Sequence, residues 1–187
     1  MSQLLDTYLK NLKKYGIERK IPNISEENAA FIKKLIREKN PKHLLEIGTA
    51  NGYSTLQFSS VIWEDSSITT IEYAWNAHIE AVEHFSNCKI KNIHALWGDA
   101  KKILPSLQNG YFDFLYIDAM KREYLDYLLL SLPKLTEDAI IVIDDVEKFR
   151  DKMENLYSYL ESNDITYRLE KTDIDDSIMI LFRNDIM

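Results

Sequence analysis

Hydrophobic positions recur with two different periods along the chain. In residues 3–15, and again after Ser25, their spacing is that of amphipathic helices, the second of which should end near Asn40-Pro41. Beyond residue 42, short apolar runs alternate with helical stretches. The expected strands are 43–47, 67–71, 92–96, 112–117 and 139–143, and the expected helices are 52–62, 75–86, 99–107, 121–131 and 146–162. This alternation predicts repeated βαβ units and a mostly parallel sheet.

The end of the chain departs from this alternation. Residues 165–169 and 177–182 have the pattern of strands, and the segment between them is too short for a crossover helix, so an antiparallel pair is expected. The predicted fold is α/β: a Rossmann-like, doubly wound, mostly parallel seven-stranded sheet with a C-terminal antiparallel hairpin. We expect a single domain over residues 1–187, with a basic helical segment at 1–42 and an α/β core at 43–187.

Composition and charge narrow the class of protein. The chain is 45% hydrophobic and 28% charged, as globular proteins are, and its single cysteine excludes an intrachain disulfide and a cysteine-based zinc site. No apolar run reaches the roughly 18 residues of a membrane span. The first residues are too charged for a signal peptide, so we expect a cytoplasmic protein without a membrane partner. Residues 1–42 carry a net charge of +5 and the rest −12; this basic segment either contacts a polyanion or forms solvated helix faces.

A loop with two glycines follows the first expected strand. Gly48 and Gly52 allow a tight turn and a close approach of the backbone to a ligand. Glu72 ends the second strand 24 residues after Gly48, where an acid can accept both hydroxyls of a ribose. Gly98-Asp99-Ala100 ends the third strand, where an adenine edge would lie. An NAD-dependent dehydrogenase is an alternative, although the G-x-x-x-G spacing lacks the third glycine of the dinucleotide fingerprint.

These motifs resemble class I S-adenosylmethionine-dependent methyltransferases. The resemblance is carried by Leu45-Glu46-Ile47-Gly48-Thr49, by the strand end at Glu72 and by Gly98-Asp99-Ala100. It implies that Glu72 holds the ribose of S-adenosylmethionine and that Gly48 and Ser54 hold its methionine end. Asp99 and Ala100 would then hold the adenine. The full set of implied cofactor residues is Glu46, Gly48, Ala50, Gly52, Tyr53, Ser54, Glu72, Tyr73, Gly98, Asp99, Ala100 and Asp118.

Acidic residues end the fourth and fifth expected strands. Asp118 follows one and Asp144-Asp145 the other, so adjacent parallel strands would bring the three carboxylates to one edge of the sheet. Carboxylates this close either raise one another's pKa or hold a cation. Hard oxygen ligands suit Mg²⁺, Mn²⁺ or Ca²⁺. The alternative is that these residues cap the helices that follow.

The segments Ile117-Asp118-Ala119-Met120-Lys121 and Ile143-Asp144-Asp145-Val146 resemble the cation-dependent O-methyltransferases. This is the catechol and caffeoyl-CoA type, whose bacterial branch includes a tRNA 5-hydroxyuridine methyltransferase. The resemblance implies that Asp118, Asp144 and Asp145 bind the divalent metal. It also implies that Lys121 accepts the proton of the acceptor hydroxyl.

Two departures from the family pattern concern the metal site and the acceptor pocket. Asp145 stands where the family has asparagine, which adds charge to the metal site. Residues 147–150 pass almost directly into an expected helix where the family has a substrate-gripping loop. The sequence therefore predicts a more open acceptor pocket.

We expect an S-adenosylmethionine-dependent O-methyltransferase with Lys121 and Asp118 as its catalytic residues. The expected acceptor is a hydroxyl of a small catechol-like or vicinal-diol molecule, with divalent-metal assistance. One alternative acceptor is a hydroxyuridine at the wobble position of tRNA, which the basic segment favours. Another alternative is a protein that keeps the cofactor fold with weak or lost turnover. The apolar stripe over residues 4–12 either forms a homodimer contact or covers its own domain.

Overall fold

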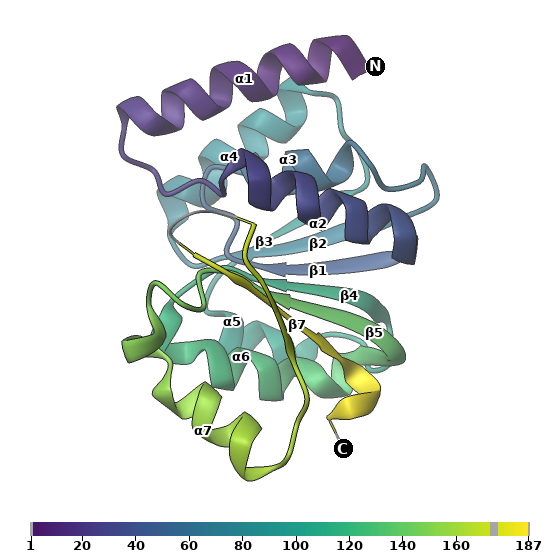
Figure 1. The fold of residues 1–187 in the computed structure, drawn as a ribbon. Helices are drawn as coiled ribbons and strands as arrows, with labels where there is room; N and C mark the ends of the chain where they lie inside the picture. Colours follow the sequence, from purple (N-terminus) through teal and green to yellow (C-terminus); the bar gives the residue numbers. More distant parts are fainter. Residues whose placement is uncertain (1, 173–175, 187) are drawn as a thin grey trace.

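The fold is one sheet with helices packed on both of its faces (Figure 1). The computed structural model describes residues 2–172 and 176–186. Within these residues, the seven strands are β1 His43–Ile47, β2 Ser67–Glu72, β3 Ile93–Trp97, β4 Phe112–Ile117, β5 Leu135–Ile143, β6 Arg168–Glu170 and β7 Ile178–Phe182. Their order across the sheet is β3-β2-β1-β4-β5-β7-β6.

The pairing of the strands confirms the predicted fold class. Neighbouring strands from β3 to β5 are parallel, whereas β7 is antiparallel to both β5 and β6. Ile47 at the end of β1 pairs with Ile71 of β2 on one side and Ile117 of β4 on the other. The strands therefore end together at one edge of the sheet. The strand order reverses between β1 and β4, which makes this edge the expected place for a ligand.

The helices fall into two groups. One face is covered by α1 Ser2–Glu18, α2 Glu26–Lys39, α3 Tyr53–Ser59 and α4 Trp75–Asn87, and the other by α5 Ala100–Ile103, α6 Tyr124–Ser131 and α7 Glu154–Ser162 (Figure 1). α2 begins after Ser25, whose side chain accepts a hydrogen bond from the backbone N–H of Asn28 (3.1 Å). It ends at Asn40, which adopts a left-handed conformation.

The apolar stripe of α1 covers its own domain. Leu9 and Leu12 are buried in the same hydrophobic cluster as Leu56 of α3 and Ala81 of α4. Leu4, at the start of the stripe, is exposed. Packing against α3 and α4 therefore accounts for the buried part of the stripe.

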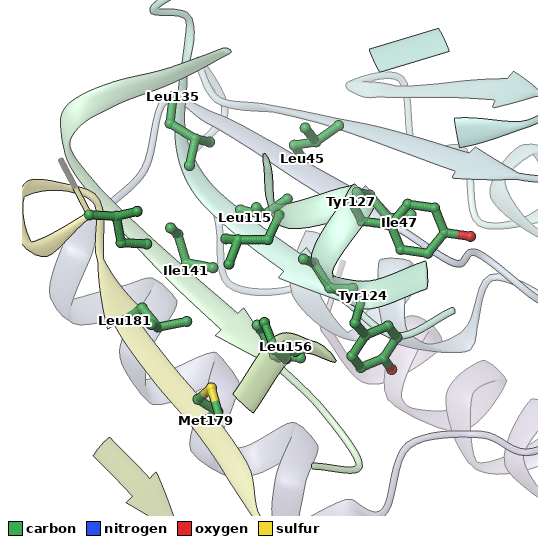
Figure 2. Close-up of a cluster of buried hydrophobic side chains, with 14 of the residues drawn as sticks. Leu45, Ile47, Leu115, Tyr124, Tyr127, Leu135, Ile141, Leu156, Met179 and Leu181 are labelled. Atoms are coloured by element: carbon green, nitrogen blue, oxygen red, sulfur yellow. The ribbon is translucent and has the colours of Figure 1, made fainter. Parts of the chain in front are cut away.

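A second hydrophobic cluster lies on the opposite face of the sheet (Figure 2). Strand residues Leu115 and Ile141 meet Tyr124 of α6 and Leu156 of α7 there, and all four side chains are fully buried. This packing fixes the first turn of α6. Because Lys121 lies just before α6, the same core places that lysine at the carboxyl edge of the sheet.

The predicted helix over 146–162 is wrong in its first half, because α7 begins at Glu154. The backbone N–H groups of Glu147 and Lys148 donate to the carboxylate of Asp176 at 3.0 and 3.2 Å. A residue from just before β7 thus holds this segment as a loop. The loop after β5 is therefore longer than the sequence predicts.

Two further boundaries differ from the prediction. The strand expected at 165–169 begins only at Arg168, because Ile165 is buried in the core below the sheet. β5 begins at Leu135, earlier than the predicted start at 139. Between β6 and β7, residues 173–175 lie outside the described residues. No helix in the described part of the chain is long and apolar enough to cross a membrane.

Candidate active site

A cavity of about 680 Å³ opens at the carboxyl ends of the parallel strands β1 to β5. Its volume is typical of small-molecule sites. One wall, here called the cofactor side, includes Gly48, Ala50, Ser54, Glu72, Tyr73, Gly98, Asp99 and Ala100. The other wall, here called the carboxylate side, includes Asp118, Met120, Lys121, Asp145 and Phe149.

Gly48 makes the turn out of β1 possible. Its φ is +103°, a value that L-residues rarely adopt, and its N–H donates to the carbonyl of Ile71 at 3.0 Å. A Cβ at this position would lie 1.9 Å from the carbonyl oxygen of Asp118. The cofactor side and the carboxylate side therefore meet at Gly48, with no room for a side chain.

Glu72 ends β2, and its carboxylate holds the loop after β1. Oε2 accepts a hydrogen bond from the N–H of Ala50 (2.8 Å), and Oε1 accepts one from the N–H of Ala74 (2.7 Å). Each carboxylate oxygen has about two lone pairs, so both atoms can also accept a ribose hydroxyl. The structure thus gives Glu72 a role in positioning the loop that the sequence did not predict.

The expected adenine end lies beside a group of exposed aromatic rings. Tyr73 lines the cavity and is exposed at its rim. Trp75 and Trp97 meet edge to face with ring centroids 4.7 Å apart, and Nε1 of Trp97 donates to the carbonyl of Tyr73 at 3.2 Å. Asp99 caps α5 by accepting the backbone N–H two residues further on, at 2.9 Å. Its carboxylate therefore already has a structural role beside the cavity.

Glu46, expected in the cofactor site, lies behind the cavity wall. It is fully buried, and its carboxylate accepts hydrogen bonds from the hydroxyls of Ser54 (2.6 Å), Thr55 and Thr70 (2.6 Å). Burial raises the pKa of Glu46 from its ordinary value of 4.5 to about 7, although the three hydroxyls oppose the rise. Glu46 braces the first turn of α3 against β1 and β2, so it supports the loop from beneath.

Gly52 and Tyr53, also predicted as cofactor residues, lie outside the cavity lining. Gly52 faces the ring of Phe85 from α4. Tyr53 is buried, and its hydroxyl accepts a hydrogen bond from Gln57 at 2.9 Å. The reason is that α3 runs away from the loop, so Ser54 is the residue of its first turn that lines the cavity.

Lys121 lies between two carboxylates on the carboxylate side. Its Nζ is 2.8 Å from Oδ1 of Asp118 and 2.7 Å from Oδ2 of Asp145, and it donates to the hydroxyl of Tyr124 at 2.6 Å. Burial disfavours the charge on Lys121, but the two carboxylates outweigh this effect and raise its pKa. In this arrangement Lys121 is an ammonium group and not a proton acceptor.

Asp144 is held in a different way. Its side chain is 2% exposed and is not among the residues that line the cavity. Oδ2 accepts a hydrogen bond from the hydroxyl of Tyr116 (2.7 Å), and Oδ1 accepts one from Nδ2 of Asn28 (2.9 Å). Burial, with help from the charge of Asp118, raises the pKa of Asp144 to about 7. Of the three predicted metal ligands, the structure brings Asp118 and Asp145 to one ammonium group and turns Asp144 into the core.

The carboxylate side has the donor chemistry of a cation site. Carboxylate oxygens are the ligands that Mg²⁺ and Mn²⁺ prefer, and the ammonium of Lys121 already occupies the point where Asp118 and Asp145 converge. Among the described residues, no three His, Cys, Asp or Glu side chains are grouped so that they could hold a metal ion. The donor types fit a divalent cation, and Asp118 and Asp145 are the residues that would hold it.

Several residues of the site were not predicted from the sequence, and Asn28 and Phe149 show why. Asn28 is 116 residues from its partner Asp144, so no local pattern connects them, although a polar residue on the buried face of α2 is a usable signal. Phe149 falls within the predicted helix 146–162, whereas in the structure it lines the cavity from the loop after β5. The missed side chains reach the site through tertiary contacts.

The chain belongs to the O-methyltransferase family, whose family model matches residues 1–156. The catechol O-methyltransferase of Mycobacterium tuberculosis is 27% identical over 124 residues, which cover 66% of this chain and 56% of that protein. O-methyltransferase ankF of Aspergillus thermomutatus is 32% identical over 115 residues, which cover 59% of this chain and 48% of that protein. The chain thus spans about half the length of these two relatives.

Solved structures share the fold. The SAH-bound methyltransferase PaMTH1 of Podospora anserina superimposes with a TM-score of 0.84 at 20% identity, covering 97% of this chain and 88% of that chain. The O-methyltransferase of Bacillus cereus in complex with SAH gives a TM-score of 0.81 at 18% identity, covering 94% and 90%. At these identities the likeness establishes the fold alone.

Proposed function

We propose that this chain is an S-adenosylmethionine-dependent O-methyltransferase that acts on a hydroxyl of a small catechol-like or vicinal-diol acceptor, with the help of a divalent cation. One observation carries the proposal. A single cavity is walled on one side by a loop shaped to approach a nucleotide-like ligand and on the other by paired carboxylates. Membership of the O-methyltransferase family supports the reaction type, and the name of the Mycobacterium tuberculosis relative supports the acceptor class.

Methyl transfer requires little covalent chemistry from the protein. The bond between the methyl carbon and the sulfonium breaks while a bond to the acceptor oxygen forms. The electron pair of the broken bond stays on sulfur, which gives S-adenosylhomocysteine, and the hydroxyl proton passes to water. The protein contributes alignment. Glu72 would hold the ribose, Gly48 and Ser54 the methionine end, and Asp99 with Ala100 the adenine, so that the methyl group points toward the carboxylate side.

The carboxylate side would orient the acceptor. Met120 and Phe149 give apolar surface beside Asp118 and Asp145, a combination that suits a flat ring with two adjacent oxygens. A divalent cation held by the two carboxylates would orient those oxygens and lower the pKa of the hydroxyl.

The tRNA alternative depends on the basic segment 1–42, and two of its cations pair with acidic residues elsewhere in the chain. Lys39 pairs with Asp138 and Lys42 pairs with Asp65, both at 2.5 Å. These contacts account for part of the basic segment without a polyanion. They favour the small-molecule acceptor.

Calorimetric titration with S-adenosylhomocysteine tests the cofactor site, with Glu72→Gln as the variant and Glu83→Gln as the control. Oε2 of Glu72 holds the loop after β1 through the N–H of Ala50, whereas Glu83 is an exposed residue of α4. We expect Glu72→Gln to weaken binding by roughly 10- to 100-fold, the range of a charge-assisted contact. Glu83→Gln should bind as the unaltered protein does.

Transfer of a labelled methyl group to a catechol, measured with Mg²⁺ and then with a chelator, tests the reaction itself. Methylated catechol that forms with Mg²⁺ and disappears with the chelator is the expected result. Absence of S-adenosylhomocysteine binding to the unaltered protein would contradict the whole proposal. Binding without any transfer would leave the alternative of a cofactor-binding protein that has lost turnover.

A further inference from the structure

We propose that Lys121 is a built-in counter-cation, whose ammonium occupies the position between Asp118 and Asp145 and which a divalent cation must displace in order to bind there. This inference rests on the proposed function, because it concerns the same cavity. It adds a competition within the protein: the affinity for the metal is set by the carboxylates and also by how firmly Lys121 holds them.

The surroundings of Nζ are those of a bound cation. Oxygens of Asp118, Asp145 and Tyr124 lie 2.8, 2.7 and 2.6 Å from it. The lysine side chain is 14% exposed, so most of its own hydration has been replaced by these three oxygens. Rings of Tyr124 and Phe149 lie about the ammonium as well, with centroids 5.0 and 5.7 Å away.

In the part of the chain that the structure describes, Lys121 is the ion-pair partner of both carboxylates. Asp118 and Asp145 would face each other as like charges if the ammonium were absent, which is unfavourable in a partly buried site. Asp144 adds to the local negative charge, but its oxygens are already bonded to Tyr116 and Asn28. An entering divalent cation therefore finds Asp144 engaged and the other two carboxylates paired with Lys121.

The residue at position 145 determines how strongly Lys121 is held. Asp145 has a φ of +59°, and this turn aims its carboxylate back toward Lys121. A neutral amide at this position would leave Lys121 paired with Asp118 alone. Asp145 therefore gives Lys121 a second ion pair, and this ion pair competes with the metal.

Direct titration with Mn²⁺, without cofactor or acceptor, tests the competition. Lys121→Met removes the ammonium and keeps a side chain of similar length, so we expect Mn²⁺ to bind about tenfold more tightly than to the unaltered protein, the effect of losing one partly buried competing ion pair. Lys121→Arg keeps the charge and should bind Mn²⁺ weakly. Lys101→Met is the matched control, because Lys101 also lines the cavity but pairs with Glu123 at 2.6 Å.

Three results would overturn the proposal. Mn²⁺ binding by Lys121→Met that is equal to or weaker than that of the unaltered protein would show that the ammonium does not compete. An absence of Mn²⁺ binding by both proteins would overturn the proposal as well. Equal gains in Lys121→Met and Lys101→Met would show a general effect of net charge. If Lys121→Met does not fold, the side-chain NMR signal of Lys121 in the unaltered protein decides instead, with Lys121→Arg used to assign it. This signal should shift as Mg²⁺ saturates the protein. A signal that stays fixed while Mg²⁺ binds would refute displacement.

The failure of this inference is distinguishable from the failure of the proposed function. The metal titrations contain no S-adenosylhomocysteine, and the cofactor titration requires no metal. A protein that binds S-adenosylhomocysteine but shows no competition keeps the proposed function and loses this inference.

Discussion

The two walls of the cavity are built by different means. On the cofactor side, the shape is set by the backbone: Gly48 turns with a positive φ, and Glu72 accepts the N–H of Ala50 in the loop after β1 and the N–H of Ala74 after β2. On the carboxylate side, charged side chains hold one another, with Lys121 bridging Asp118 and Asp145. The first wall is formed before any ligand arrives, whereas the second is closed around its own cation.

This difference indicates which parts of the site can change on binding. Backbone hydrogen bonds between β1, its loop and β2 leave the cofactor side little freedom. The carboxylate side can rearrange when one cation replaces another, because its contacts are between side chains. We therefore expect substitutions on the cofactor side to affect folding and cofactor affinity, and substitutions on the carboxylate side to affect cation and acceptor binding.

The substitution with the largest expected effect disrupts the contact between the two walls. Gly48→Ala places a Cβ 1.9 Å from the backbone carbonyl oxygen of Asp118. Because that atom is backbone, the two walls must move apart, and we expect a loss of roughly 3–5 kcal/mol in the free energy of unfolding. Gly110→Ala is the control, since Gly110 has a φ of +59° with nothing within 4 Å of a new Cβ. It should cost only about 1 kcal/mol.

Chemical denaturation of both glycine variants measures these effects. Similar losses in the two proteins would mean that backbone strain alone accounts for the effect. The contact between the walls would then be looser than described.

The next effect concerns the buried support of the cofactor side. The pKa of Glu46 is about 7 in the folded protein against an ordinary value of 4.5, so the folded protein keeps a proton that the unfolded chain loses between these values. The contribution of Glu46 to stability is therefore complete below about pH 4.5 and is lost as the pH rises to about 7, by up to about 3 kcal/mol.

Glu46→Gln isolates this contribution, because its neutral side chain does not titrate. The difference in the free energy of unfolding between the unaltered protein and Glu46→Gln should fall steadily from about pH 4.5 to about pH 7 and then level off. A difference that is independent of pH would show that Glu46 is ionised throughout and that its hydroxyl partners compensate for burial.

The smallest effect sharpens the contrast between the walls. Asn28→Ala removes the donor that α2 supplies to the carboxylate of Asp144, and we expect a loss of about 1–2 kcal/mol. Asn92→Ala is the control, because Asn92 donates to the neutral carbonyl of Ser66, and it should lose less than about 1 kcal/mol. The affinity of Asn28→Ala for S-adenosylhomocysteine should stay unchanged.

Denaturation and calorimetry on the same two samples check this expectation. If Asn28→Ala weakens the binding of S-adenosylhomocysteine as much as Glu72→Gln does, the two walls are not independent, and the contrast between them fails.

Most of the fold could be predicted because its pattern is local. Alternating apolar runs gave the parallel strands, and the short connection before β7 gave the antiparallel end. The differences come where distant residues intervene. Residues 146–153 form no α-helix, because Asp176 accepts two of their N–H groups. Glu46, a predicted cofactor residue, is enclosed by three hydroxyls.

The sequence by itself determined the class of fold, the edge of the sheet where chemistry gathers, and the residue types on each wall, because strand periodicity and strand-end residues follow from local chain geometry. Only the tertiary structure decided that Asp144 faces Asn28 and Tyr116 while Asp145 faces Lys121. Two neighbouring aspartates share one local sequence and differ only in backbone direction. Which way each carboxylate points depends on donors brought in from α2, from β4 and from the turn before α6.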